Sequence, residues 1–151
     1  MKFSAVDTFR ALVEPVFRRP DFVQTAAICV RDGAIGREVL LVSSRGSKRW
    51  IVPKGWPMKH RTLAQAALQE AWEEAGVIGT VNETCLGTYS YRKMVKGGVP
   101  VTCNCDAFLV DVTQLADEWP EKAMRGRVWM SPSDASEAVA ELGLKKILLE
   151  L

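Results

Sequence analysis

"GWPMKHRTLAQAALQEAWEEAGV", residues 55–77, contains the most informative pattern in this chain. It opens with a loop and continues as a helix rich in alanine and leucine. We expect the helix to begin near Thr62, because Thr62 and Gln65 match a capping box, T-L-A-Q. Gly76 is placed to end the helix in a left-handed conformation. The second half of this helix therefore holds three glutamates, at positions 70, 73 and 74.

These glutamates are predicted to lie close together. A helix advances by about 100° per residue, so Glu70 and Glu74 lie about 40° apart, with Glu73 on the adjoining side. Carboxylates this close repel one another unless a positive charge lies among them. A hard divalent cation with oxygen ligands satisfies that need. A solvated acidic end of a surface helix is the alternative, although acidic residues late in a helix oppose its dipole. Spacing alone leaves both interpretations open.

Charge is distributed unevenly along the chain, although the net charge is only +2. Residues 39–69 contain no acidic residue, and neither do residues 84–105. The charged residues of these two stretches are all basic: Arg45, Lys48, Arg49, Lys54, Lys59, Arg61, Arg92, Lys93 and Lys96. Any one of them is equally well explained as a solvated loop residue. Two basic stretches around one acidic helix, however, indicate a metal site beside an anion site.

Residues 55–77 resemble the Nudix box, whose pattern is G-x5-E-x7-R-E-U-x-E-E-x-G-U, where U is a bulky aliphatic residue. Six residues fall on this pattern at the right spacing: Gly55, Glu70, Glu73, Glu74, Gly76 and Val77. The flanking stretches "EVLLVSSRGSKRWIVPKGW" and "DEWPEKAMRGRVWMSPSDA" resemble the diphosphoinositol polyphosphate phosphohydrolase branch of this family. Together these similarities cover roughly residues 24–140, which is most of the chain.

The resemblance implies an α+β fold, the α/β/α sandwich of Nudix proteins with a mixed β-sheet. It also implies a hydrolase that uses Mg2+, or alternatively Mn2+, to cleave a phosphoanhydride bond. The substrate would be a nucleoside diphosphate derivative, a dinucleoside polyphosphate or a diphosphoinositol polyphosphate. The residues that match the family's metal ligands are Gly55, through its carbonyl, and Glu70, Glu73 and Glu74. Glu73 and Glu74 are also candidates for the catalytic base. Four basic residues of the acid-free stretches are expected to hold phosphate: Arg45, Lys54, Arg92 and Lys93.

Two residues depart from the box pattern. Arg61 stands where the family has its first glutamate, and Gln69 replaces an arginine that orients the neighbouring carboxylate. Losing both members of a glutamate–arginine pair leaves no stranded partner. We therefore expect a working enzyme with altered surroundings of its metal site. The alternatives are a catalytically weak Nudix-fold binding module that senses a nucleotide or polyphosphate, and an acidic-helix interaction protein without a metal.

Several residues near the box have open roles. Glu118 and Glu121 are expected to be solvated loop charges, with the alternative that they reach over the site as bases. His60, the only histidine, is expected to be exposed. Trp56 is the best aromatic candidate to line the pocket, whereas Trp72 is expected to pack in the core.

Strands and helices are predicted to alternate around the box helix. Strand patterns occupy residues 24–31, 37–44, 49–53, 81–92, 99–112 and 125–131. A helix is predicted from Pro132, with Ser131 as its N-cap, and a last short helix follows at 144–151. This length and order predict a single domain over residues 1–151, in which residues 1–20 form an N-terminal appendage.

Composition argues against several classes of protein. The four cysteines form no C-x-x-C pair, so zinc is not expected, and buried free thiols indicate a cytoplasmic protein. The first ten residues lack the apolar core of a signal peptide, and no apolar run is long enough to span a bilayer. We expect a phosphate-rich small molecule as substrate, with neither a membrane nor duplex nucleic acid as partner.

Overall fold

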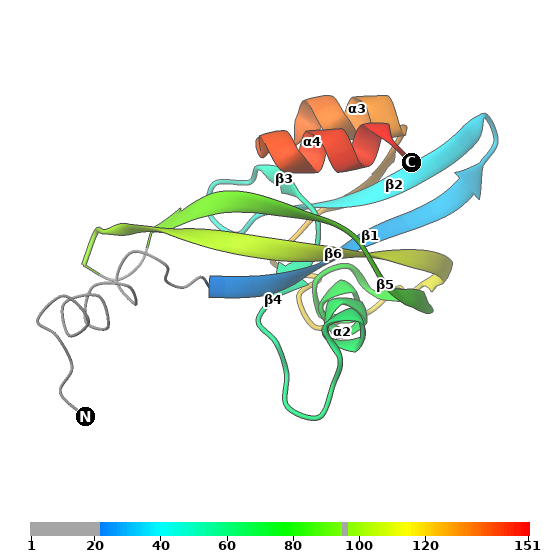
Figure 1. Ribbon diagram of the computed structural model, residues 1–151. Helices are drawn as coiled ribbons and strands as arrows, with labels where there is room; N and C mark the ends of the chain where they lie inside the picture. Colours follow the sequence, from blue (N-terminus) through cyan, green and yellow to red (C-terminus); the bar gives the residue numbers. More distant parts are fainter. Residues whose placement is uncertain (1–21, 95–96) are drawn as a thin grey trace, which may run out of the picture.

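The computed structural model describes residues 22–94 and 97–151, in which a mixed β-sheet of seven strands is the central layer (Figure 1). The strands are β1 (Phe22–Gly33), β2 (Gly36–Ser43), β3 (Trp50–Ile51), β4 (Lys54–Gly55), β5 (Val77–Met94), β6 (Pro100–Leu115) and β7 (Arg127–Met130). The helices of these residues are α2 (Leu63–Ala75), α3 (Pro132–Ala138) and α4 (Leu142–Leu149). The N-terminal appendage predicted at residues 1–20 lies outside the described residues.

The sheet has the strand order β3-β2-β1-β6-β5, with β1 and β6 parallel and the other neighbouring pairs antiparallel. β7 extends the pairing of β2, and β4 pairs with the start of β1. In that last pairing Gly55 lies opposite Thr25, and Lys54 lies opposite Ala26. The glycine that opens the box is therefore fixed to the central strand of the sheet.

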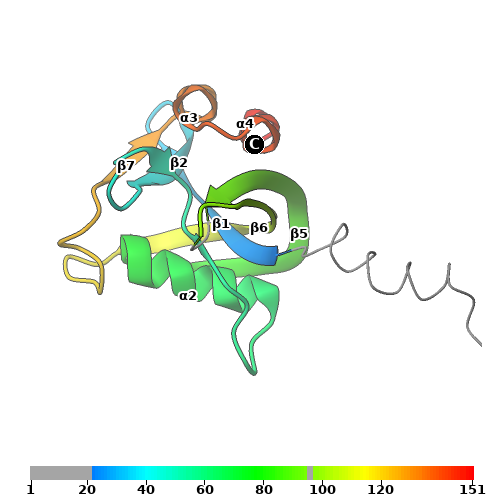
Figure 2. The ribbon, with the colours of Figure 1, turned by 90° about the vertical axis from the view of Figure 1, so that its left-hand side faces the viewer.

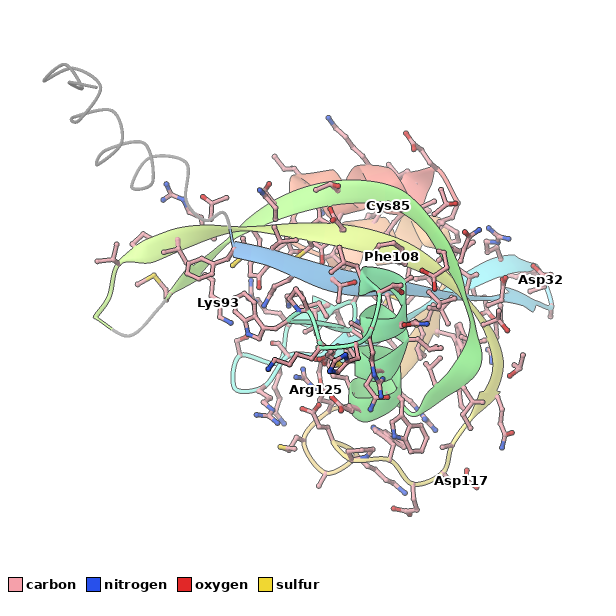
Figure 3. All side chains as sticks on the ribbon, turned by 60° about the horizontal axis from the view of Figure 1, so that its bottom comes forward. Asp32, Cys85, Lys93, Phe108, Asp117 and Arg125 are labelled. Carbon is pink, nitrogen blue, oxygen red and sulfur yellow. The ribbon has the colours of Figure 1, made fainter. Side chains whose placement is uncertain are left out.

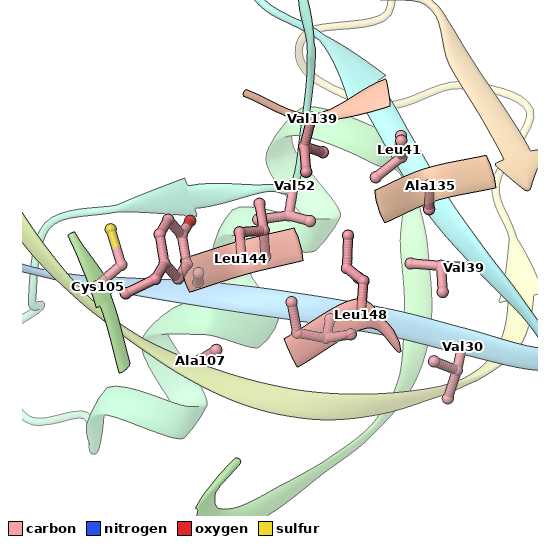
Figure 4. Close-up of a cluster of buried hydrophobic side chains, with 13 residues drawn as sticks. Val30, Val39, Leu41, Val52, Cys105, Ala107, Ala135, Val139, Leu144 and Leu148 are labelled. Carbon is pink, nitrogen blue, oxygen red and sulfur yellow. The ribbon is translucent and has the colours of Figure 1, made fainter. Parts of the chain in front are cut away.

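Helices cover both faces of the sheet, with α2 on one face and α3 and α4 on the other (Figures 1 and 2). Residues 24–30 of β1 are all buried, as expected for a central strand with both faces covered. Val30 points to the α3–α4 side, where it lies in a core cluster with Leu144 and Leu148 (Figure 4). Ile28 belongs to the same cluster. The intervening residues, including Cys29, belong to the cluster under α2.

The box helix has the ends that the sequence predicts. The side chain of Thr62 accepts a hydrogen bond from the backbone amide of Gln65, and Oε1 of Gln65 accepts one from the backbone amide of Thr62. Gly76 has φ 67° and ends the helix in the left-handed region. One face of α2 is made of small residues that are fully buried against the sheet: Ala64, Ala67, Ala71 and Ala75. This packing fixes the rotation of α2, and with it the direction of its glutamates.

The predicted α+β fold with a mixed sheet is confirmed, but β4 was not predicted as a strand and several boundaries differ by up to four residues. β5 begins at Val77, directly after Gly76, and not at Val81. The reversal at Gly76 brings Val77 opposite Leu115 at the end of β6, and irregular pairing between Val81 and Gly87 obscures the alternation in the sequence. α4 begins at Leu142, two residues before the predicted start.

Candidate functional site

A cavity of about 810 Å³ lies beside the last turns of α2. Glu70 and Glu74 line it from α2, and Gly55 lines it from β4. The helix is held over the sheet by its alanine face and by Thr25, whose hydroxyl donates to the carbonyl of Leu63 at 2.6 Å. Local helix geometry and strand pairing together therefore bring three of the four predicted metal ligands to one cavity: Gly55, Glu70 and Glu74.

Glu74 is the most buried charged residue at this cavity, with 5% of its surface exposed. Its Oε2 accepts a hydrogen bond from the Lys54 amide at 3.2 Å, and its Oε1 accepts one from Arg125 at 3.4 Å. Burial raises the pKa of Glu74 to about 7, against the attraction of Arg125 and with repulsion from Glu70. The folded protein thus holds this carboxylate where ionisation is costly unless more positive charge arrives.

Glu70 lies against Gly55, and the contact requires glycine. A Cβ added at position 55 would lie 2.1 Å from Oε1 of Glu70. The pKa of Glu70 is also raised to about 7, first by burial and then by the charges of Glu73 and Glu121. Two half-buried or buried carboxylates with raised pKa values, beside a backbone that leaves room for them, form a donor set of hard oxygens. These residues fit a divalent cation such as Mg2+ or Mn2+.

Glu73 is placed differently from the other two box glutamates. Its Oε1 accepts a hydrogen bond from the side-chain amide of Gln69 at 3.0 Å, and it does not line the cavity. Its backbone carbonyl accepts a hydrogen bond from the amide of Glu121 at 3.0 Å. Across residues 22–94 and 97–151, no three acidic, histidine or cysteine side chains form a ready-made metal-binding group. The metal role of Glu73 therefore stays a prediction.

A loop after β6 adds charges to the site that the sequence interpretation underestimated. Glu121 is 15% exposed and pairs with Arg45 at 2.8 Å and with Arg125 at 3.3 Å. The expectation that Glu121 is a solvated loop charge is therefore wrong. The same expectation is confirmed for Glu118, whose side chain is 84% exposed and pairs with Lys122.

All four predicted phosphate-binding residues line the same cavity: Arg45, Lys54, Arg92 and Lys93. Lys54 is half-buried, and its Nζ lies 5.1 Å from the centre of the Tyr91 ring. The Nζ of Lys93 lies 4.8 Å from the ring centre of Trp56, which also lines the cavity, as predicted. Figure 3 shows Lys93 near the strand ends and Arg125 close to α2. The cavity therefore places basic side chains around one buried and one half-buried carboxylate.

The cavity residues to which the sequence analysis gave no role include Arg125, Gln24 and Tyr91. Arg125 is 9% exposed and also donates to the carbonyl of Ser43 at 3.1 Å. The hydroxyl of Tyr91 donates to the buried side chain of Gln24. Arg125 is 51 residues from Glu74 along the chain, so no local pattern links the two.

The remaining predictions about side chains have mixed outcomes. His60 is exposed as expected, with φ 63° in the loop before α2. Trp72 is half-buried and lines a second cavity of about 530 Å³ with Leu68 and Val77. It belongs to neither core cluster, so its expected core position is wrong.

The chain is similar to known proteins both in sequence and in fold. A sequence profile described as NUDIX domain matches residues 21–151. "Nudix hydrolase 12, mitochondrial" of Arabidopsis thaliana is 36% identical over 103 residues, covering 66% of this chain and 51% of the relative. "Diphosphoinositol polyphosphate phosphohydrolase 3-alpha" of Homo sapiens is 31% identical over 114 residues, covering 74% and 65%. The chain thus spans about half to two thirds of the length of these relatives.

Two solved structures share the fold. The C. elegans Ap4A hydrolase has a TM-score of 0.60 at 21% identity and covers 85% of this chain and 94% of its own. The NUDIX domain of Shewanella oneidensis NrtR complexed with ADP ribose has a TM-score of 0.64 at 16% identity and covers 98% of each chain.

A mixed sheet between helices, with box glutamates at a cation-lined cavity, defines a Nudix-type protein. The chain belongs to the NUDIX family, as the box pattern predicts. Its relatives are named hydrolases, and Nudix hydrolases generally use divalent metals. In the described part of the chain, the helices are too short or too polar to cross a membrane.

Proposed function

We propose that this chain is a Mg2+-dependent Nudix hydrolase that cleaves a phosphoanhydride bond in a phosphate-rich small molecule. Candidate substrates are dinucleoside polyphosphates, diphosphoinositol polyphosphates and nucleoside diphosphate derivatives such as ADP-ribose. The names of the human relative and of the two solved structures support these three classes. Mn2+ is the alternative metal.

The observation that supports this proposal most strongly is the pairing of opposite charges at one cavity. Glu70 is half-buried and Glu74 is buried, and burial raises the pKa of both to about 7, which disfavours their negative charges. Basic side chains line the same cavity, beside these carboxylates. A divalent cation on the glutamates and a polyphosphate on the basic residues neutralise both sets of charges together.

Each group of residues has a separate task in this proposal. Glu70 and Glu74, together with the carbonyl of Gly55 and the carboxylate of Glu73, would hold the cation. When bound, the cation polarises phosphoryl oxygens and lowers the pKa of water. Arg125 supports Glu74 from the protein side, since it donates to Glu74 and is almost fully buried. Glu73 and Glu74 remain the box candidates for accepting a proton, and Glu121 stays an alternative because it pairs with Arg125, which also contacts Glu74.

Phosphate would be held by the four basic side chains of the cavity, Arg45, Lys54, Arg92 and Lys93. Arg45 is 60% exposed and is bound in the free protein only by Glu121 among the described contacts, so a phosphate oxygen can replace that partner. Lys54 and Lys93 are steadied by aromatic rings and keep their charge for an anion.

The test is a phosphate-release assay over a panel of these three substrate classes, with and without Mg2+. Turnover that requires a divalent cation and is lost in Glu70→Gln supports the proposal. Binding of a panel member without turnover, at any metal concentration, contradicts it and favours the alternative.

The alternative is a binding module that senses a nucleotide or polyphosphate. It is favoured by Arg61 and Gln69, which replace two charged residues of the box pattern. Equilibrium binding of ADP-ribose and of a dinucleoside polyphosphate, measured beside the turnover assay, separates the two functions.

We propose a cytoplasmic location because all four cysteines, which lie in the described residues, are free thiols. Some plant relatives are named mitochondrial or chloroplastic, so microscopy of the tagged protein is the test.

A further inference from the structure

The two residues that depart from the box pattern are bonded to each other and to a box glutamate. Nη1 of Arg61 donates to Oε1 of Gln69 at 2.9 Å. Nε2 of the same amide donates to Oε1 of Glu73 at 3.0 Å. Gln69 and Glu73 are one turn apart on α2, whereas Arg61 lies in the loop before the N-cap. The side chains of Arg61, Gln69 and Glu73 are therefore joined by two consecutive hydrogen bonds, and we call this arrangement the relay.

The chemistry of the three groups fixes the direction of the relay. A guanidinium only donates hydrogen bonds, and an ionised carboxylate only accepts them. The amide between them must therefore present its oxygen to Arg61 and its nitrogen to Glu73. An acidic group at position 61 would attract the amide nitrogen instead, and the amide oxygen would then face Glu73. The sign of the charge at position 61 thus decides whether Glu73 is held or repelled.

We propose that Gln69, oriented by Arg61, is the positioning residue that holds the carboxylate of Glu73 beside the metal site. This inference rests on the proposed function, because it assigns the relay to the cation-binding glutamates. It explains why the loss of the box glutamate and arginine need not abolish the site. A neutral amide restrains Glu73 through one hydrogen bond and leaves its negative charge available for a cation.

A simple surface network is the competing explanation. Pairs of side chains one turn apart on a helix have small effects in isolation, and Arg61 is exposed. The relay differs from such a network in a measurable way. If it positions Glu73, breaking it changes cation affinity even where the charge of the protein is conserved. If it is only a surface network, cation affinity follows net charge alone.

Four variants of the full chain distinguish these explanations. Gln69→Met removes both hydrogen bonds with no change in charge and little change in helix propensity. Arg61→Glu should turn the amide of Gln69 so that its oxygen faces Glu73. In the double variant Arg61→Glu with Gln69→Arg, the new arginine can again donate a hydrogen bond to Glu73. Lys59→Glu is the matched control, because Lys59 is exposed, lies two residues from Arg61 and undergoes the same change in charge.

The measurement is Mg2+ affinity without substrate, by titration calorimetry, with Mn2+ affinity by electron paramagnetic resonance as a second readout. We expect Gln69→Met and Arg61→Glu each to weaken affinity about tenfold, the usual effect of removing a group that orients a metal ligand. The double variant should recover most of the loss. Lys59→Glu should stay within about twofold of the unmodified protein, as an exposed charge is screened by solvent.

Three results overturn the proposal. Unchanged affinity in a folded Gln69→Met protein removes the role of the amide. Equal changes in cation affinity for Arg61→Glu and Lys59→Glu would show that only the net charge matters, and not the hydrogen bonds of the relay. Unmodified protein that binds neither cation contradicts the metal assignment itself, so failure of the proposed function is recognised separately from failure of the relay. Arg61 is exposed, so its variants remain informative if Gln69→Met does not fold.

Discussion

Replacing Glu74 by glutamine should stabilise the metal-free protein while abolishing its metal-dependent activity. Burial and Glu70 raise the pKa of Glu74 from an ordinary value of 4.5 to about 7, and the nearby Arg125 and Lys54 only partly oppose this. Ionising this carboxylate in the folded chain therefore costs about 3 kcal/mol more than in the unfolded chain. Glutamine keeps the shape of the side chain and an oxygen for the Lys54 amide, and it never ionises.

The direction of the pH dependence follows from the raised pKa. The stability contributed by neutral Glu74 is fully present below pH 4.5 and is lost as pH rises through 7. At pH 8, Glu74→Gln should therefore raise the free energy of unfolding by about 1–3 kcal/mol, or roughly 5 °C in Tm. At pH 5 the gain should shrink to under about 1 kcal/mol. Added Mg2+ should raise Tm in the unmodified protein and have little effect on the variant.

The assay is thermal unfolding at pH 5 and pH 8, with and without Mg2+, beside phosphate release. Glu118→Gln is the matched control, since it makes the same change at a side chain that is 84% exposed. It should leave Tm and turnover unchanged at both pH values. A Glu74→Gln protein that is less stable than the unmodified protein at pH 8, or that keeps full turnover, would refute the reasoning.

Three further outcomes are expected. Arg45→Ala and Lys54→Ala should each lower kcat/KM more for substrates with four to six phosphates than for those with two. Each lost charge-assisted hydrogen bond should reduce transition-state stabilisation by up to roughly 1.5–3 kcal/mol. Equal losses on both kinds of substrate would contradict a polyphosphate site. Gly55→Ala should reduce metal-dependent turnover at least about tenfold, because the added Cβ would lie 2.1 Å from the Glu70 carboxylate. Gly126→Ala is the control and should leave turnover unchanged, because its added Cβ would lie 3.8 Å from the nearest atom, Oγ of Ser43. Mg2+ affinity should rise between pH 6 and 8 as both cavity glutamates lose protons, and calorimetry in buffers of different ionisation enthalpy should detect proton release.

Local patterns predicted the parts of this protein that depend on neighbours along the chain. The capping box at Thr62, the left-handed Gly76 and the N-cap at Ser131 all have the predicted geometry. These features follow from backbone hydrogen bonding within a few residues, so the sequence specifies them directly. Glu70 and Glu74 share a cavity for the same reason, since residues four apart lie on one face of a helix.

Contacts between distant segments were not predictable in this way. Arg125 and Glu121 come from a loop after β6, and their distance from Glu74 depends on how that loop folds back over α2. The irregular pairing of β5 with β6 hid the true start of β5, because register shifts break the alternation on which strand prediction depends.

The sequence by itself determined the family, the α+β class, the box helix and the cluster of negative charge on that helix. Only the tertiary structure decided which carboxylates face the cavity and which charges oppose them. Glu73 lies within the box pattern, yet its side chain is held by Gln69, while Glu74 is buried against Lys54 and Arg125. The physical reason is that burial and long-range electrostatics depend on the packing of the whole sheet, and no periodicity along the chain encodes either of them.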